Sequence, residues 1–177
     1  YDLLPGLPAG AAEQHPETWF EAVETVVGAL VAAPGVDARR IAGIGVSGQQ
    51  HGLVALDGDD RVVRPAKLWC DTTTAAEAEE LSRLLGRPVP CGFTAPKVRW
   101  LARHEPENWR RTRAVLLPHD YVNFRLTGAK TMEAGDASGT GFFDPVARRF
   151  DAAAVAATAV DLDAKLPPLL APGTPAG

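Results

Sequence analysis

A polar segment bracketed by glycines is the strongest candidate for binding chemistry in this sequence. Residues 47–52 read SGQQHG and follow the apolar run 41–46, IAGIGV, which is typical of a strand buried on both faces. Open α/β sheets bind ligands at the carboxyl ends of their strands, and glycines there let a small ligand come close. A glutamine amide and the imidazole of His51 offer donors and acceptors at two angles, which suits the adjacent hydroxyls of a sugar. A polar turn in which His51 makes only a local hydrogen bond is the alternative interpretation.

Trp69 and Asp71, in the sequence WCD, fit the other half of such a pocket. An aromatic face packs against the C–H groups of a sugar, and a carboxylate accepts hydrogen bonds from its hydroxyls. Two other interpretations stay open. A tryptophan on a strand is often a core residue, and Asp71 can simply start the turn before Thr74.

Other known binding and catalytic motifs are excluded by the residues that surround them or are absent from the sequence. Residues 43–48, GIGVSG, match the formal pattern G-x-G-x-x-G, but a dinucleotide site needs a helix after the last glycine, and a hairpin is predicted instead. Ser47 lacks the second glycine of a hydrolase nucleophile elbow, because Gln49 stands in its place. No phosphate-binding G-x-x-x-x-G-K-[ST] loop occurs, and the four histidines are scattered without the i, i+4 spacing of a zinc site.

Helices and strands alternate along the chain, which predicts an α/β fold. Hydrophobic spacing and capping residues predict helices from Pro16 for about four turns, from a Thr74/Glu77 capping box to Leu85, from Thr94 to before Pro106, from Pro118 to before Gly128, and from Asp151. Apolar runs predict strands at 41–46, 67–70 and 114–117 and a hairpin of 53–56 with 61–63. A buried strand needs neighbours on both edges, and the chain supplies few. The sequence therefore reads as a piece of a longer protein, with a partial domain at 1–165 and a Pro/Gly-rich linker or interrupted end at 166–177.

Composition bounds the class of protein. The chain has 177 residues, a formal charge of −4 and 46% hydrophobic residues, as expected for one soluble domain with a core of its own. No apolar stretch is long enough to span a membrane, and no run of Lys and Arg exceeds two residues, so neither a membrane nor a nucleic-acid partner is expected. Two cysteines, Cys70 and Cys91, without a C-x-x-C motif fit a reducing cytoplasm.

Five motifs in a fixed order resemble the FGGY carbohydrate kinases, and most of all the xylulokinase branch of that family. They are SGQQHG at 47–52, LWCD at 68–71, GFTAPKVRWL at 92–101, LPHDY at 117–121 with RLTG at 125–128, and DASGT at 136–140. The resemblance covers nearly the whole chain. It departs from the family at Gln50, where methionine is common, and at Ala11, where tryptophan is common.

The resemblance implies an actin-like, ribonuclease H-like fold, of which this chain is part of the N-terminal sugar-binding domain. It implies ATP-dependent transfer of a phosphoryl group to D-xylulose, with ATP and Mg²⁺ as the expected cofactors. By carry-over, Gln50 and His51 contact the sugar, Trp69 and Asp71 lie near the same pocket, and Lys97 and Trp100 have structural roles. A homodimer of the full-length enzyme is also an open expectation.

The motifs that the family uses for catalysis are not found in these residues. A glycine-rich hairpin with a phosphate-handling aspartate, a Gly-Asp-Gln motif with the catalytic aspartate, and an ATP-binding domain are all missing from the sequence. No residue is therefore named as the catalytic base, and the chain alone is expected to be inactive. Two alternatives are another kinase of the family, acting on ribulose, gluconate or glycerol, and a non-catalytic sugar-binding module.

Overall fold

The computed structural model describes residues 2–171 and 173–177. Tyr1, where the predicted domain begins, and Pro172, in the predicted tail, lie outside the described residues. The helices are α1 (Pro16–Val31), α2 (Ala75–Leu85), α3 (Thr94–His104), α4 (Pro106–Arg111), α5 (Pro118–Thr127), α6 (Ala134–Ala137) and α7 (Ala152–Thr158), with 3-10 turns at Ala38–Arg40 and Asp163–Lys165.

The strands are short and pair two by two. They are β1 (Glu13–Gln14) with β3 (Ala66–Lys67), β2 (Val54–Leu56) with β4 (Ala114–Leu116), β5 (Met132–Glu133) with β8 (Leu169–Leu170), and β6 (Phe143–Asp144) with β7 (Arg149–Phe150). The β5–β8 pair is parallel and the other three are antiparallel.

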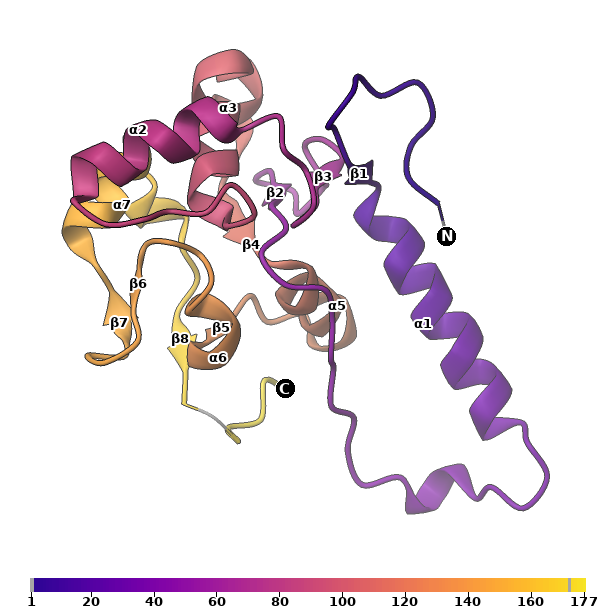
Figure 1. Cartoon of the computed structure of the whole chain (residues 1–177). Coiled ribbons are helices and arrows are strands. Elements are labelled where there is room, and N and C mark those ends of the chain that lie inside the picture. The colour runs from indigo at the N-terminus through magenta and orange to yellow at the C-terminus, as the bar shows by residue number, and fades with distance from the viewer. Residues whose placement is uncertain (1, 172) are drawn as a thin grey trace.

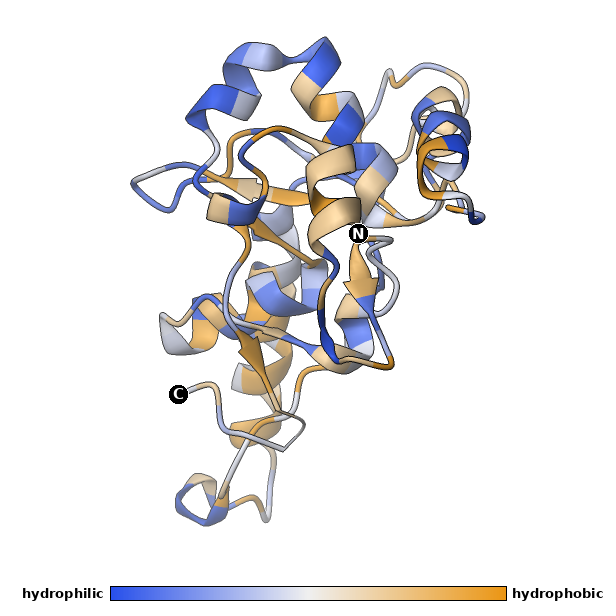
Figure 2. Ribbon diagram, turned by 90° about the vertical axis from the view of Figure 1, so that its left-hand side faces the viewer, coloured by the Kyte–Doolittle hydropathy of each residue, from blue (hydrophilic) through white to orange (hydrophobic). Residues whose placement is uncertain are grey.

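The β2–β4 pair separates two hydrophobic cores. Alternate residues of a strand point to opposite faces. Accordingly, Ala55 and Val115 belong to a core built with α2, α3, α4 and α7, whereas Val54 and Leu116 belong to a core built with α1 and α5. Figure 1 shows α2, α3 and α7 gathered on one side of β2 and β4 and α1 with α5 on the other. The strands near the middle are orange in the hydropathy view, and the helices around them carry blue stretches (Figure 2). Helices therefore cover both faces of the β2–β4 pair, in agreement with the predicted α/β class.

The five predicted helices and the strands expected at 53–56 and 114–117 are confirmed. The strand expected at 67–70 is limited to Ala66–Lys67, and the 61–63 arm of the hairpin is reduced to one bridge between Leu56 and Val62. The capping box predicted before α2 is wrong. The helix begins at Ala75 and ends at Leu85, and the positive φ of 64° at the following Gly86 terminates it as predicted. The Thr74 side chain makes no capping hydrogen bond. Its hydroxyl instead lies 3.4 Å from the Cys91 sulfur. Tertiary contacts with the loop before α3 therefore outweigh the local cap.

The buried strand predicted at 41–46 is also wrong for this structure. The segment forms no strand, and Ile41 and Ile44 are 50% and 63% exposed. A strand is stabilised by ladder hydrogen bonds and by packing on both faces. Among the described residues no strand pairs with this segment. In Figure 1 it runs as part of the long connection from the end of α1 back to the body of the molecule.

The predicted tail at 166–177 is partly structured, because β8 (Leu169–Leu170) pairs with β5. The two cysteines, Cys70 and Cys91, are free thiols. Within the described residues no helix has the length and apolar character needed to cross a lipid bilayer.

Candidate sugar-binding site

His51 lies at a corner where three segments meet. Its φ of 64° is in the left-handed region, which a non-glycine residue adopts at a cost and which re-aims the side chain. The Phe93 ring lies 5.3 Å from the imidazole, centroid to centroid. The Thr94 hydroxyl donates a hydrogen bond of 3.2 Å to the His51 carbonyl. The start of α3 therefore holds both the backbone and one face of the ring.

Two glycines let the segment 48–52 lie flat against the start of α5. A Cβ built on Gly48 would be 3.2 Å from the His119 Cα, and one on Gly52 would be 2.8 Å from the Pro118 ring. Both distances are shorter than ordinary van der Waals contacts allow. The glycines predicted to permit close approach of a ligand instead permit close approach of the chain itself.

The surroundings of His51 favour the neutral form of its imidazole. Burial lowers its pKa, and the positive charge of Lys97 lowers it further. Nδ1 is buried and has no hydrogen-bond partner among the described residues. His51 as a whole is only half-buried, and Gln50 next to it is exposed. The corner is therefore open to solvent, as a binding site at these two residues requires.

Trp69 leaves the β-ladder at the same end as His51. Leu53 and Lys67 form an antiparallel bridge, so the residues before Leu53 and those after Lys67 leave it at the same end. The pairing stops there, because Trp69 and Cys70 form a turn. The Trp69 side chain is 57% exposed, so it is not the core tryptophan that the sequence also allowed. A Cβ on Gly92 would lie 3.0 Å from the Trp69 carbonyl oxygen, which brings the Trp69 loop against the segment that precedes α3.

Asp71 is buried, at 1% exposure, and its carboxylate is used by the chain itself. One oxygen accepts from the Ala12 N–H at 2.9 Å and from the Lys67 ammonium at 3.3 Å. The other accepts from the Thr73 N–H and hydroxyl at 2.9 and 2.5 Å. This argues against the direct contact with a sugar that the sequence predicts for Asp71. The carboxylate instead fixes the loop that carries Trp69.

Lys97 fixes the backbone of the segment before α3 by hydrogen bonds. It is fully buried, and its ammonium donates to the carbonyls of Cys91, Gly92 and Phe93 at 3.1, 2.7 and 2.9 Å. Burial lowers the pKa of Lys97 to about 8. Three charge-assisted hydrogen bonds to consecutive carbonyls fix the backbone next to both Trp69 and His51. This geometry agrees with the structural role expected for Lys97.

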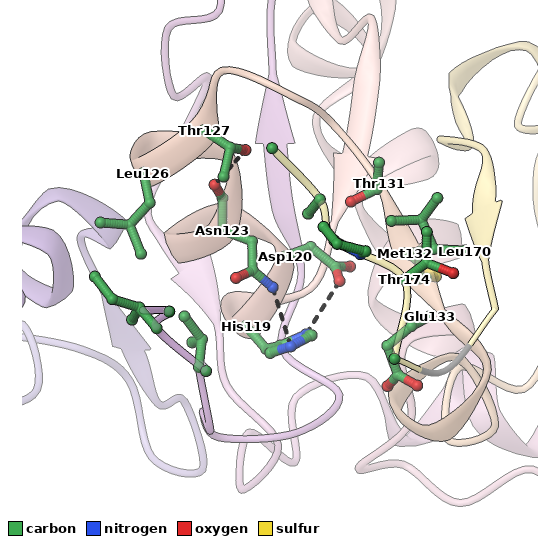
Figure 3. A pocket seen from close by; sticks show the side chains of 18 of the residues that line it. His119, Asp120, Asn123, Leu126, Thr127, Thr131, Met132, Glu133, Leu170 and Thr174 are labelled. Carbon is green, nitrogen blue, oxygen red and sulfur yellow. Dashed lines mark hydrogen bonds and ion pairs between the residues drawn. The ribbon is translucent and has the colours of Figure 1, made fainter. Parts of the chain in front are cut away.

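A second group of titratable side chains lies at the start of α5. His119 Nδ1 is 3.2 Å from the Asp120 carboxylate, and His119 Nε2 is 3.1 Å from the Asn123 amide nitrogen, as the dashed lines in Figure 3 show. Asp136 lies 3.8 Å from His119 Nδ1. The hydrogen bond to Asp120 raises the pKa of His119, and burial raises the pKa of Asp120.

Asp136 is buried and its carboxylate has no hydrogen-bond partner among the described residues. Burial, reinforced by the charge of Asp120, raises the pKa of Asp136 to about 6. Sequence reasoning did not predict this group as a site, although its members occur in the LPHDY and DASGT motifs. His119 and Asp120 also line a cavity of about 940 Å³ whose walls include Asn123, Met132 and Glu133 (Figure 3). The described residues contain no cluster of three or more His, Cys, Asp or Glu side chains arranged to hold a metal ion.

The N-terminal domain of the FGGY family of carbohydrate kinases matches residues 6–177 of the chain. The chain belongs to the FGGY family. Its relatives in the family include the xylulose kinase of Haemophilus influenzae, which is 40% identical over 177 residues. That alignment covers 91% of this chain and 36% of the relative. The xylulose kinase of Streptomyces coelicolor is 41% identical over 175 residues, covering 93% of this chain and 35% of the relative.

A solved FGGY-family structure agrees with the fold. The crystal structure of a xyloylose kinase from Brucella ovis superposes with a TM-score of 0.87 at 40% identity, covering 96% of this chain and 36% of that one. The fold is therefore the actin-like α/β fold of the FGGY kinases, as the resemblance implied. The chain spans about a third of the length of the relatives that it matches.

Proposed function

We propose that this chain is the sugar-binding part of an ATP-dependent xylulose kinase and that the ketose binds at Gln50, His51 and Trp69. The observation that carries the proposal is the corner at His51, where the imidazole lies between Phe93 and the backbone of Gly139 yet His51 stays partly open to solvent beside an exposed glutamine. Identities near 40% to xylulose kinases support the choice of substrate.

The proposed reaction transfers the γ-phosphoryl group of ATP to the terminal hydroxyl of D-xylulose, giving xylulose 5-phosphate and ADP. In it Gln50 and His51 bind and orient the sugar hydroxyls, and the exposed ring of Trp69 packs against the C–H face. Correct placement of the acceptor hydroxyl is a large part of catalysis in phosphoryl transfer. ATP and a divalent metal ion are general requirements of the family. We assign neither of them, nor the catalytic base, to a residue of this chain.

Asp71 has a supporting role in this proposal. Its carboxylate fixes the loop of Trp69 through Ala12, Lys67 and Thr73, and so places the ring for the proposed contact with the sugar. Solved structures of a gluconate kinase from Lactobacillus acidophilus and a glycerol kinase from Plasmodium falciparum are 24% and 19% identical to this chain. Identities this low support the fold alone, so the xylulose proposal is preferred to these alternatives.

The test is a kinase assay of the full-length protein in which this chain occurs, with D-xylulose, ribulose, gluconate and glycerol as acceptors. We expect xylulose to give the highest kcat/KM. His51→Ala should raise the KM for xylulose by about 5- to 150-fold, because a hydrogen bond at a ligand site contributes about 1–3 kcal/mol. His104→Ala, a half-exposed histidine stacked on Trp100, is the matched control and should leave the KM unchanged.

An unchanged KM in His51→Ala would contradict the proposed contact, and a preference for another acceptor would contradict the proposed substrate. The 177-residue chain by itself should show no phosphorylation. Xylulose-dependent ADP formation by that chain would contradict its assignment as the sugar-binding part alone.

A further inference from the structure

The imidazole of His51 occupies the space that a side chain at position 139 would need. A Cβ built on Gly139 would lie 1.6 Å from His51 Cε1, 2.1 Å from Nδ1 and 2.6 Å from Nε2. Each of these distances is well inside any permitted contact. The Cε1 edge of the ring therefore points directly at the backbone of Gly139, although the two residues are far apart in the sequence.

The backbone conformation at position 139 does not itself call for glycine. The φ of Gly139 is not in the left-handed region, so other residues could adopt this backbone, whereas the neighbouring Gly141 has a φ of +91°. No other atom is among the three nearest to the added Cβ. The ring of His51 is therefore the nearest obstacle to a side chain at this position.

The loop that carries Gly139 is held in place and cannot simply retreat. The Ala95 N–H donates to the Thr140 carbonyl at 2.7 Å, and the Arg87 guanidinium donates to the Gly141 carbonyl at 2.8 Å. The same end of α3 also holds the His51 carbonyl through the Thr94 hydroxyl. The start of α3 therefore fixes the ring and the glycine relative to each other.

We propose that Gly139 is a positioning residue that sets the orientation and the tautomer of His51 for the ketose. Phe93 contacts one side of the ring, and the backbone at Gly139 closes its Cε1–Nδ1 edge. Nδ1 is buried without a partner, and a buried N–H without an acceptor is rarer than a buried acceptor without a donor. The proton of the neutral ring therefore resides on Nε2, which donates to an oxygen of the sugar. This inference rests on the proposed function for its ligand, but its geometry does not.

The experiment uses Gly139→Ala, His51→Ala and the double variant in the full-length protein. Gly139→Ala should raise the KM for xylulose about tenfold or more while kcat changes less than about threefold, since the added methyl displaces the ring. The double variant should have the KM of His51→Ala alone. Gly135→Ala is the matched control, because the three atoms nearest to its Cβ all belong to the Glu133 carboxyl group and none to His51. A KM unchanged in Gly139→Ala, or effects that multiply in the double variant, would overturn the proposal.

Two further readouts do not depend on the substrate. The NMR signal of the His51 Cε1–H should shift in Gly139→Ala and stay in place in Gly135→Ala. If wild-type protein does not use xylulose, the proposed function fails, and this signal still decides the positioning role: an unshifted signal overturns it. If Gly139→Ala is insoluble, the double variant should recover soluble protein, because the clash is gone. A double variant that is equally insoluble would also refute the proposal.

Discussion

The buried carboxylate of Asp136 makes the sharpest prediction about stability. Burial and the charge of Asp120 raise its pKa from 3.8 to about 6, while His119 partly offsets the rise. Between about pH 4 and 6 the native state then binds this proton more tightly than the unfolded chain does. Stability falls as the pH rises through that window, and above about pH 6 the full cost of the buried charge is present.

Replacing Asp136 with Asn removes the charge and keeps the shape. A shift of about 2 pKa units corresponds to roughly 3 kcal/mol at 1.36 kcal/mol per unit. Asp136→Asn should therefore stabilise the protein by about 3 kcal/mol at pH 7 and by only about 1 kcal/mol at pH 4.5, where the native carboxyl is already protonated.

The assay is urea unfolding followed by tryptophan fluorescence, at both pH values, for wild type and variant. Asp59→Asn, at an exposed aspartate of the hairpin turn, is the control and should change stability by less than about 0.5 kcal/mol at either pH. The Asp136 carboxyl carbon should also titrate near pH 6 in an NMR experiment. A gain that is equal at both pH values, or a titration near pH 4, would refute the reasoning.

Two other substitutions separate structure from binding. Lys97→Met removes the donor to three consecutive carbonyls and should lower the free energy of unfolding by about 3–5 kcal/mol, measured as a lower urea midpoint and as faster hydrogen exchange in residues 91–93. Lys97→Arg tests whether a positive charge alone is sufficient. A methionine variant as stable as the wild type would contradict the structural role of Lys97. Trp69→Ala removes a residue that is 57% exposed, so the free energy of unfolding should change by about 0.5 kcal/mol or less while the KM for xylulose rises severalfold. A large loss of stability with an unchanged KM would instead make Trp69 a packing residue.

Helix limits were readable from the sequence because their signals are local. Pro16 at the start of α1, Gly86 after α2 and Gly128 after α5 act through their own backbone geometry, and each stands where the helix begins or ends. The capping box at Thr74 failed for the complementary reason. Its hydroxyl had a second partner in Cys91, which lies 17 residues away and is not visible to a local pattern.

The candidate site also contains features that the sequence predicted and features that it could not. The SGQQHG and LWCD motifs pointed to Gln50, His51 and Trp69, and the structure leaves these three residues half-buried or exposed. The spacing of residues in the sequence could not show that the Asp71 carboxylate accepts hydrogen bonds from Ala12, Lys67 and Thr73, because these contacts depend on how β1 and β3 pair. The apolar run 41–46 was predicted as a buried strand from its composition, which reports the preference of the residues but not the presence of a neighbour.

By itself the sequence determined the residue types, the order of helices and strands and the family, since these follow from local propensity and from motifs that keep their order along the chain. Only the tertiary structure decided which atoms meet: that His51 is seated against Gly139, that Lys97 holds three carbonyls, and that Asp136 is buried without a hydrogen bond. The physical reason is that burial and contact depend on residues far apart in the sequence, brought together when helices pack on the two faces of β2 and β4.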